Sequence, residues 1–200
     1  KGAWLEVLKG QFPEKAKDEI KILDIGTGPG FFPVILAEAG YKVTAVDYTQ
    51  EMLDTAKRNA GNLCERISFY KMDAQNLEFE DDVFDVVISR NLTWNLKDPK
   101  RAYEEWCRVL KPGGHLLIIE LSSPHRFPMK QLFSVYAKIV MPLIGRLISK
   151  DHSAYSYLPA TMAAFPQGEV MQGILRKAGF GDVCFKRFTF GISTMYLATK

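Results

Sequence analysis

Three glycines lie close together near the start of the chain, in the stretch LDIGTGPGFF, residues 23–32. Gly26, Gly28 and Gly30 separate a short apolar run from a segment of helical character. Glycine has no Cβ, so its backbone can approach a ligand closely and present N–H donors at a helix N-terminus. The spacing is G-x-G-x-G, not the G-x-G-x-x-G of dinucleotide-binding turns. The pattern predicts a ligand-binding turn, and a tight turn without a ligand is the alternative.

Two carboxylates follow at the ends of the next predicted strands. Asp47 closes KVTAVD, where a carboxylate can accept hydrogen bonds from both hydroxyls of a ribose. Asp73 stands in KMDA, where a carboxylate could accept from an adenine amino group. For each residue the alternative is a simple turn acid. Together with the glycines, they indicate a nucleoside-containing ligand.

The elements that must position these residues alternate between strands and helices. Apolar runs predict strands, and segments bounded by capping residues, prolines and glycines predict helices. The expected strands are 21–25, 42–47, 67–73, 84–90 and 115–120, and the expected helices are 31–40, 49–61 and 98–114. Such an order predicts right-handed crossovers and a parallel sheet. Segments 182–190 and 192–200, joined only by Gly191, instead predict a terminal antiparallel hairpin.

Five ordered motifs resemble the class I S-adenosylmethionine-dependent methyltransferases: LDIGTGPG, VTAVDYTQEML, KMDA, FDVVISR and VLKPGGHLLI. The resemblance implies an α/β, Rossmann-like, doubly wound seven-stranded sheet, mostly parallel, with an antiparallel C-terminal strand. It implies that Asp24 and the loop Gly26–Gly30 cradle the methionine portion, that Asp47 holds the ribose and that Met52 flanks the adenine. The expected cofactor-binding set is Asp24, Gly26, Thr27, Gly28, Gly30, Asp47, Tyr48, Met52, Asp73, Ala74 and Arg90.

The end of the chain, residues 154–200, resembles the C-methyltransferases of ubiquinone and menaquinone biosynthesis. The shared pattern is Tyr-x-Tyr-Leu, Phe-Pro, Ala-Gly-Phe and Thr-x-Gly-Ile, and Arg90–Asn91 matches a pair carried by that family. The first half departs from it, because Pro29–Gly30–Phe31 stands where an acidic residue usually closes the glycine loop. Residues 89–114 are more similar to generic small-molecule methyltransferases. The chain is therefore either a divergent member or a hybrid of two branches.

A ring-carbon acceptor needs a phenolate-like donor, and ionising a phenol of pKa near 10 at pH 7 costs about 4 kcal/mol. A base, or a cation that lowers the phenol pKa, could offset this cost. The expected catalytic residues are Arg90, Asn91, His152 and Tyr155, and further candidates are Trp94, His125, Asp151 and Tyr157. For most of these side chains a structural role is the alternative. His115, at a strand start, is expected to be structural.

The composition excludes other classes of function. A net charge of +3 is too small for a nucleic-acid binder. Cys64, Cys107 and Cys184 lie far apart without a CxxC pair, which favours free thiols in a reducing compartment and no metal site. No secretory signal or spanning segment is visible, so a cytoplasmic location is expected.

One methyltransferase domain is expected over residues 1–200, with a cofactor-binding half at 20–120. Residues 121–170 are expected to form an acceptor-binding lid, and 171–200 the last helix and the hairpin. The stretch 129–150 has apolar residues at helical spacing beside four cations, which predicts a lid helix. A sharper interpretation adds contact with the inner face of a membrane.

The predicted function is C-methylation of a quinol-type acceptor in menaquinone or ubiquinone biosynthesis, with S-adenosylmethionine as cofactor. The interpretation with membrane contact adds a prenylated quinol as the acceptor. Three alternatives stay open: a generic O-, N- or C-methyltransferase, an NAD(P)-binding oxidoreductase, and a non-catalytic S-adenosylmethionine-binding module. The sequence leaves open the oligomeric state, the prenyl length and the identity of a general base.

Overall fold

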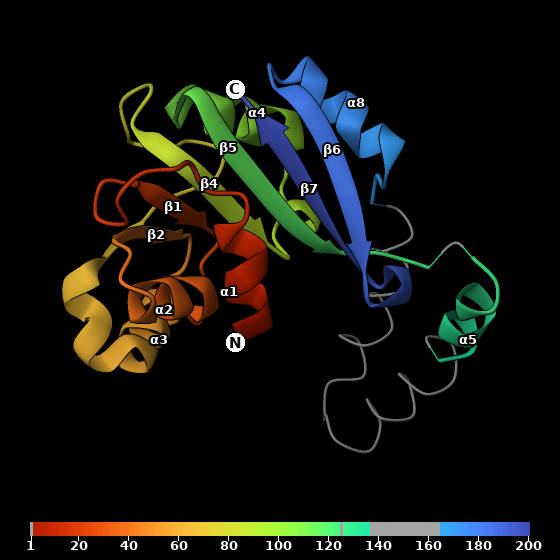
Figure 1. Ribbon diagram of the computed structural model, residues 1–200, viewed down its shortest axis with the longest axis horizontal. Coiled ribbons are helices and arrows are strands. Elements are labelled where there is room, and N and C mark those ends of the chain that lie inside the picture. The colour runs from red at the N-terminus through yellow and green to blue at the C-terminus, as the bar shows by residue number, and fades with distance from the viewer. Residues whose placement is uncertain (1, 125, 137–164) are drawn as a thin grey trace.

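The computed structural model describes residues 2–124, 126–136 and 165–200. In these residues seven strands form one sheet, in the order β3-β2-β1-β4-β5-β7-β6 (Figure 1). The strands are β1 Ile22–Ile25, β2 Val43–Asp47, β3 Ile67–Lys71, β4 Phe84–Arg90, β5 Leu110–Leu121, β6 Gly181–Phe188 and β7 Ser193–Thr199. Strands β1 to β5 pair in parallel, whereas β7 is antiparallel to both β5 and β6. The predicted fold class is confirmed.

Helices cover both faces of this sheet (Figure 1). On one face lie α1 Gly2–Lys9, α2 Phe31–Glu38 and α3 Gln50–Ala60, and on the other α4 Pro99–Val109 and α8 Glu169–Lys177. Short 3-10 turns are η1 Gly61–Arg66, η2 Thr93–Asn95 and η4 Thr189–Gly191. Helix α5, Met129–Val135, lies apart from the sheet at the lower right of the view. Because both faces are covered, β1 is buried throughout and β4 almost throughout, as expected for central parallel strands.

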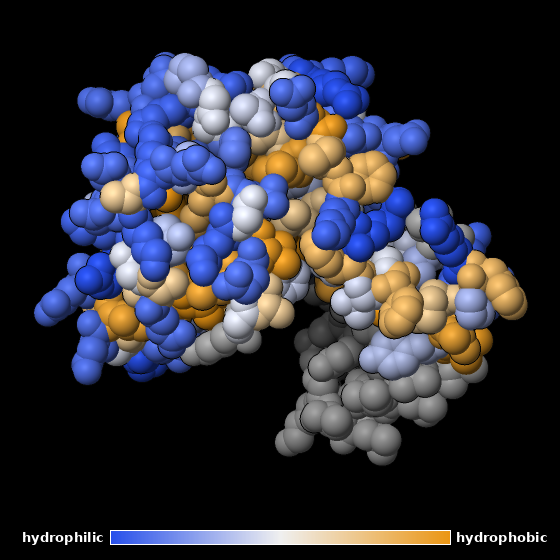
Figure 2. Space-filling view, viewed as in Figure 1, coloured by the Kyte–Doolittle hydropathy of each residue, from blue (hydrophilic) through white to orange (hydrophobic). Residues whose placement is uncertain are grey.

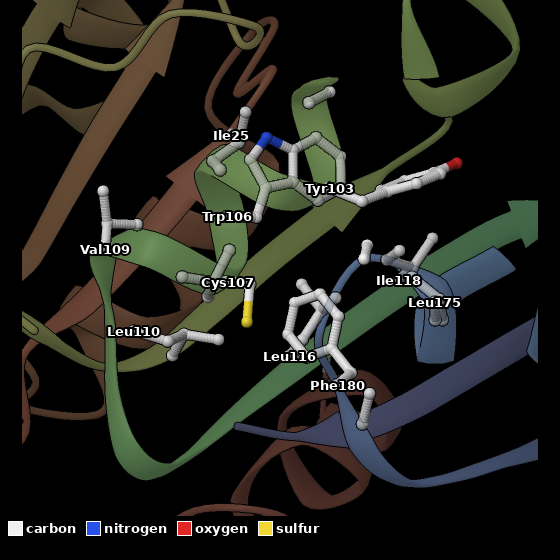
Figure 3. Packing of buried hydrophobic residues seen from close by; sticks show 14 of the residues in the cluster. Ile25, Tyr103, Trp106, Cys107, Val109, Leu110, Leu116, Ile118, Leu175 and Phe180 are labelled. Atoms are coloured by element: carbon white, nitrogen blue, oxygen red, sulfur yellow. The ribbon is translucent and has the colours of Figure 1, made fainter. Parts of the chain in front are cut away.

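The larger core lies between the sheet and helices α4 and α8. Tyr103 and Trp106 are fully buried there, with ring centroids 5.3 Å apart in edge-to-face geometry. Figure 3 shows both rings among side chains from β1, β5 and α8. The indole Nε1 of Trp106 donates to the backbone oxygen of Ala74 at 2.9 Å. The core therefore fixes Ala74, which follows β3 at the carboxyl edge of the sheet.

A buried carboxylate, Asp85, lies at the start of β4, at the amino ends of the parallel strands. Its side chain is 4% exposed and accepts from Lys15 Nζ at 2.7 Å and from Lys111 Nζ at 3.0 Å. The backbone N–H of Lys21 adds a third donor at 2.9 Å. These bonds depress the pKa of Asp85 against the opposing effect of burial. The cluster joins segments before β1, in β4 and in β5, and it lies at the end of the sheet away from the glycine loop.

Two expected boundaries are wrong. The helix predicted over 98–114 ends at Val109, and Lys111–Gly114 belongs to the extended start of β5. Pro112 cannot continue a helix, and Leu110 already pairs with Phe84 of β4. Strands β6 and β7 are joined not by Gly191 alone but by η4 and Ile192. Three consecutive residues with positive φ turn the chain there: Thr189, Phe190 and Gly191.

Other local expectations agree with the structure. Gly40, at φ 95°, closes α2, and the N–H groups of Gly40 and Tyr41 donate to Ala37 and Leu36 in the pattern of a Schellman motif. Thr49 stands at the N-cap of α3, but its hydroxyl donates to Asp47 and does not cap the helix.

Of the expected lid helix only α5 and Tyr136 are described, since residues 137–150 lie outside the described residues. In the described part no helix is long and apolar enough to cross a membrane.

Candidate functional site

Two adjoining cavities open at the carboxyl ends of β1, β2 and β4, which is where open α/β sheets bind ligands. Their volumes are about 290 and 470 Å³, and we call them the first and the second cavity. Four residues line both of them: Gly26, Asp47, Leu92 and Asn95. The two cavities therefore form one groove with a shared middle.

The glycine loop between β1 and α2 has a backbone conformation that favours glycine. Gly26, Gly28 and Gly30 have φ values of 68°, 52° and 84°, where side chains with a Cβ are strained. A Cβ on Gly26 would lie 2.8 Å from Leu92 Cδ2, and one on Gly30 would lie 2.9 Å from Ala56 Cβ. A Cβ on Gly28 would meet nothing within 4 Å. Two glycines thus serve close packing, while Gly28 lies open beside the second cavity.

Asp47 ends β2 between the two cavities and binds the glycine loop. Its Oδ2 accepts from the backbone N–H of Gly28 at 2.8 Å. Its Oδ1 accepts from the backbone N–H of Thr49 at 3.0 Å and from the Thr49 hydroxyl at 3.1 Å. A carboxylate has about four acceptor positions, so capacity remains for a ligand hydroxyl. The sequence placed Asp47 at this edge but did not anticipate its bond to Gly28.

Asp24 and Arg90 face the second cavity from β1 and from the end of β4. Asp24 is 3% exposed, and burial raises the pKa of its carboxyl to about 7. The Thr27 hydroxyl and the Arg90 charge lower this pKa, and Asp47 raises it. The guanidinium of Arg90 lies 4.5 Å from the ring centroid of Phe31 and 5.3 Å from that of Phe32. Within the described residues Asp24 has no ion pair, so a cationic ligand group would offset its burial.

The first cavity holds the other predicted residues. Asp73 and Ala74 line it, and Asp73 Oδ1 accepts from the backbone N–H of Gln75 at 2.9 Å. Tyr48 also lines it and is 70% exposed. Met52 lines the second cavity and not the first. Met52 therefore lines one part of the groove, and Asp73 and Ala74 line the other.

Two of the predicted catalytic residues, Arg90 and Asn91, lie at the groove. Arg90 and Asn91 line the second cavity, and Asn91 has a φ of 54° while its N–H donates to the Ile119 oxygen at 3.0 Å. Trp94 lines a separate cavity of about 280 Å³ with Tyr103 and Phe165. The ring of His115 contacts the backbone oxygen of Gln11 and lies away from the groove. The candidates outside the described residues are His125, Asp151, His152, Tyr155 and Tyr157.

Several residues of the groove were not singled out from the sequence, among them Phe31, Phe32, Leu92 and Asn95. The paired phenylalanines after Gly30 were a usable signal, since two rings at the start of a helix can receive a cation. Leu92 and Asn95 gave no such signal, because nothing in an isolated leucine or asparagine predicts which turn faces a ligand.

The fold and the groove fit the cofactor that the motifs imply. The open backbone at Gly28 leaves room for a close ligand, and Thr27 lines the same cavity. Asp24 offers a buried carboxyl with a raised pKa to an α-ammonium group, and Asp47 offers acceptor capacity to ribose hydroxyls. The groove thus offers oxygen acceptors and apolar walls, which suit an uncharged nucleoside and a sulfonium amino acid.

Known proteins similar to this chain agree with that fit. A model of the ubiE/COQ5 methyltransferase family matches residues 4–200. The demethylmenaquinone methyltransferase of Bacteroides fragilis is 44% identical over 184 residues, covering 90% of this chain and 75% of that protein. The protein of the same name from Chlorobaculum parvum is 40% identical over 183 residues, covering 91% and 74%. Both halves of the chain therefore match one family, although the first half resembles generic small-molecule methyltransferases.

Among solved structures, an S-adenosylmethionine-dependent methyltransferase from Thermotoga maritima, described as a possible histamine N-methyltransferase, is similar with a TM-score of 0.67. Its identity is 22%, and the match covers 98% of this chain and 87% of that one. A putative methyltransferase from Bacillus halodurans has a TM-score of 0.68 at 19% identity, covering 100% and 99%. At such identities the likeness shows the fold alone.

Proposed function

Because the chain belongs to the ubiE/COQ5 methyltransferase family, we propose that it C-methylates a quinol of the demethylmenaquinol type. The family confirms two predictions from the sequence, the methyltransferase activity and the cofactor S-adenosylmethionine. An NAD(P)-binding oxidoreductase is the wrong alternative. The acceptor is proposed from the name shared by relatives that are 36–44% identical over nine tenths of the chain.

On the cofactor side, we assign the second cavity to the amino-acid portion and the first to the nucleoside. Asp24 would hold the α-ammonium group, and that cation would return the carboxyl to its ionised form. Asp47 would accept from the ribose hydroxyls while it keeps Gly28 in place. Asp73 and Ala74 would border the base. Gly26 and Leu92, which line both cavities, would then border the part of the cofactor that joins its two portions.

On the acceptor side, the proposal depends on the positive charge of Arg90. When bound, the cofactor would supply an electrophilic methyl group to the quinol ring carbon, with its sulfur as the leaving group. Arg90 would lower the pKa of the quinol hydroxyl, so that the ring carries phenolate character, and the displaced ring proton would leave to a base or to water. The rings of Phe31 and Phe32 hold the guanidinium in one orientation. Asn91 lines the same cavity and could orient the acceptor oxygen.

A labelled-methyl assay tests this function. The intact protein is given S-adenosylmethionine with demethylmenaquinol, a demethoxy-ubiquinol precursor or a panel of small phenols. Rapid transfer to demethylmenaquinol alone supports the proposal. The variant Asp47→Ala is the control, because it measures any transfer of label that does not depend on the cofactor site. Transfer to a small phenol only would assign a generic methyltransferase. Cofactor binding without transfer to any acceptor would assign a binding module.

We also propose a peripheral membrane contact for the surface around α5. Phe127 and Phe190 are 82% and 79% exposed, and they line a cavity of about 610 Å³ with Arg126, Lys186 and Arg187. No carboxylate is among the described residues that line this cavity. Figure 2 shows apolar side chains on the α5 lobe next to strongly hydrophilic ones. Exposed aromatic rings among cations fit an anionic lipid surface, from which a prenylated acceptor would be drawn.

Vesicle sedimentation tests this contact. The protein should bind phosphatidylglycerol vesicles, bind phosphatidylcholine vesicles weakly, and lose binding in the double variant Phe127→Ser, Phe190→Ser. Tyr70→Ser is the matched control, because Tyr70 is 45% exposed on β3, the edge strand farthest from β6 in the sheet. Equal binding by the double variant and the wild type would contradict the proposal.

A further inference from the structure

Glu120 places a buried carboxyl group at the end of the apolar strand β5. The residue is 2% exposed and pairs in register with Thr194 of β7. Its Oε1 accepts three hydrogen bonds: from the backbone N–H of Leu92 at 3.0 Å, from that of Thr93 at 2.8 Å and from the Thr93 hydroxyl at 2.8 Å. Its Oε2 is buried and has no hydrogen-bond partner among the described residues. Burial of such a group is costly, so its retention calls for a function.

The three donors belong to one turn, Asn91–Thr93, which leads from β4 into η2. Asn91 adopts a left-handed conformation with φ 54°, and its own N–H is bonded to the Ile119 oxygen. The next two N–H groups lie at the start of a 3-10 turn, where the chain offers no acceptor of its own. A single oxygen of Glu120 satisfies both, so this carboxyl fixes the path of the turn.

The same turn forms the wall between the two halves of the groove. The Leu92 side chain lies over Gly26 so closely that a Cβ there would meet Leu92 Cδ2 and Cδ1 at 2.8 and 2.9 Å. Leu92 lines both cavities, and Asn91 lines the second. A shift of this turn would therefore move the wall beside the glycine loop and the residue next to Arg90 together.

We propose that Glu120 is a positioning residue for cofactor binding: through its hydrogen bonds to Leu92 and Thr93 it holds Leu92 against Gly26 at the middle of the groove. The proposal rests on the proposed methyltransferase site. Glu120 itself lines neither cavity, so it acts through the turn and not by contact with the ligand.

The chemistry of the carboxyl defines a conservative replacement. Burial raises the pKa of Glu120 to about 7, against the opposing effects of the Thr93 and Leu92 donors. The neutral form is therefore well populated near pH 7, and a glutamine imitates it, with one oxygen for the three donors and an amide in place of the protonated oxygen. The acceptor at Oε1 is needed for positioning, and the negative charge is not.

Calorimetric titration with S-adenosylmethionine tests the inference. Glu120→Ala should raise the Kd for the cofactor at least ten-fold, and Glu120→Gln should stay within about three-fold of the wild type. Leu92→Ala should reproduce the loss, and the double variant Glu120→Ala, Leu92→Ala should lose little more than either single variant, because both act on one wall. Melting temperatures are recorded for every variant.

Asp85→Ala is the matched control. Asp85 is similarly buried in the same sheet and also accepts hydrogen bonds from backbone and side-chain donors, but it lies at the amino ends of the parallel strands, away from the groove. It should lower the melting temperature and leave the cofactor Kd unchanged. An unchanged Kd in Glu120→Ala, or no rescue by Glu120→Gln, overturns the inference. If Glu120→Ala does not fold, an unchanged Kd in Leu92→Ala overturns it.

This readout does not depend on the acceptor. A wild-type protein that binds the cofactor but methylates no quinol would contradict the proposed function and leave the Glu120 test in force. A wild-type protein that binds no S-adenosylmethionine would overturn both.

Discussion

The backbone N–H of Gly28 donates to Oδ2 of Asp47 at 2.8 Å, so the tip of the glycine loop is bonded to the end of the neighbouring strand. The carboxylate that is expected to accept from a ribose thus also holds the loop that is expected to receive the methionine portion. A loop held before the ligand arrives loses less conformational freedom on binding. Asp47 therefore couples the two halves of the groove.

Replacement of Asp47 should weaken cofactor binding strongly. Asp47→Ala removes charge-assisted bonds to the ligand and to Gly28, each of which contributes about 1.5–3 kcal/mol, so the Kd should rise about 10- to 100-fold or more. Asp47→Asn should give an intermediate value, because its amide nitrogen faces an N–H donor on one side. Calorimetric titration measures both. Asp54→Ala, on the exposed face of α3, is the control and should leave the Kd unchanged.

The buried Asp24 should make the cofactor-free protein less stable as the pH rises. Its folded pKa of about 7 lies above the unfolded value of 3.8, so the folded state binds more protons between these values. The contribution of Asp24 to the free energy of unfolding therefore falls from pH 4 to pH 7 and is level above. Asp24→Asn should be more stable than the wild type by about 4 kcal/mol at pH 8 and by about 2 kcal/mol at pH 5.5.

Urea unfolding at the two pH values measures this difference. Glu120 titrates in the same range but is present in both proteins, so its contribution cancels in the comparison. The same variant should bind S-adenosylmethionine poorly, since it has lost the partner of the α-ammonium group. A stability difference that is the same at both pH values would contradict this prediction, because it would mean that the folded state does not raise the pKa of Asp24.

Replacing glycine by alanine at positions 26 and 173 should have opposite effects on the stability of the fold. Gly26→Ala strains a residue at φ 68° and pushes against Leu92, so both the melting temperature and the cofactor affinity should fall. Gly173→Ala, inside α8, meets nothing within 4 Å and should stabilise the fold by about 0.5–1 kcal/mol without a change in turnover. Thermal unfolding and the labelled-methyl assay check both. An intact site in Gly26→Ala would mean that Leu92 can move away freely.

Loss of Arg90 should reduce turnover more than cofactor affinity. Arg90→Ala removes the cation that would stabilise phenolate character, an interaction that strengthens as charge develops, so kcat should fall much more than the Kd rises. Arg90→Lys keeps the charge but not the planar stacking on Phe31 and Phe32, and should retain part of the activity. Equal losses in affinity and kcat would assign Arg90 to the cofactor or the fold.

The sheet was predictable because each parallel strand is an apolar run between clear turn signals, as in ILDI and FDVVISR. The join between α4 and β5 was not, because KPGG ends a helix equally well as a turn or as extended chain, and the pairing of Leu110 with Phe84 decided it. The glycines and Asp47 were found because their types are restricted by backbone geometry and charge. Leu92 and Glu120 were missed because their roles arise from contacts between segments far apart in the chain.

Strand β7 has one further consequence. It follows β5 and β6 in the sequence but lies between them in the sheet. During synthesis β5 therefore leaves the ribosome as an unpaired edge, and the backbone groups along residues 115–121 that face β7 lack their partners until residues 193–199 have emerged. Self-association of nascent chains competes with folding over that interval. A ribosome stalled before residue 193 should hold a chain that recruits chaperones, whereas one stalled well beyond the hairpin should not.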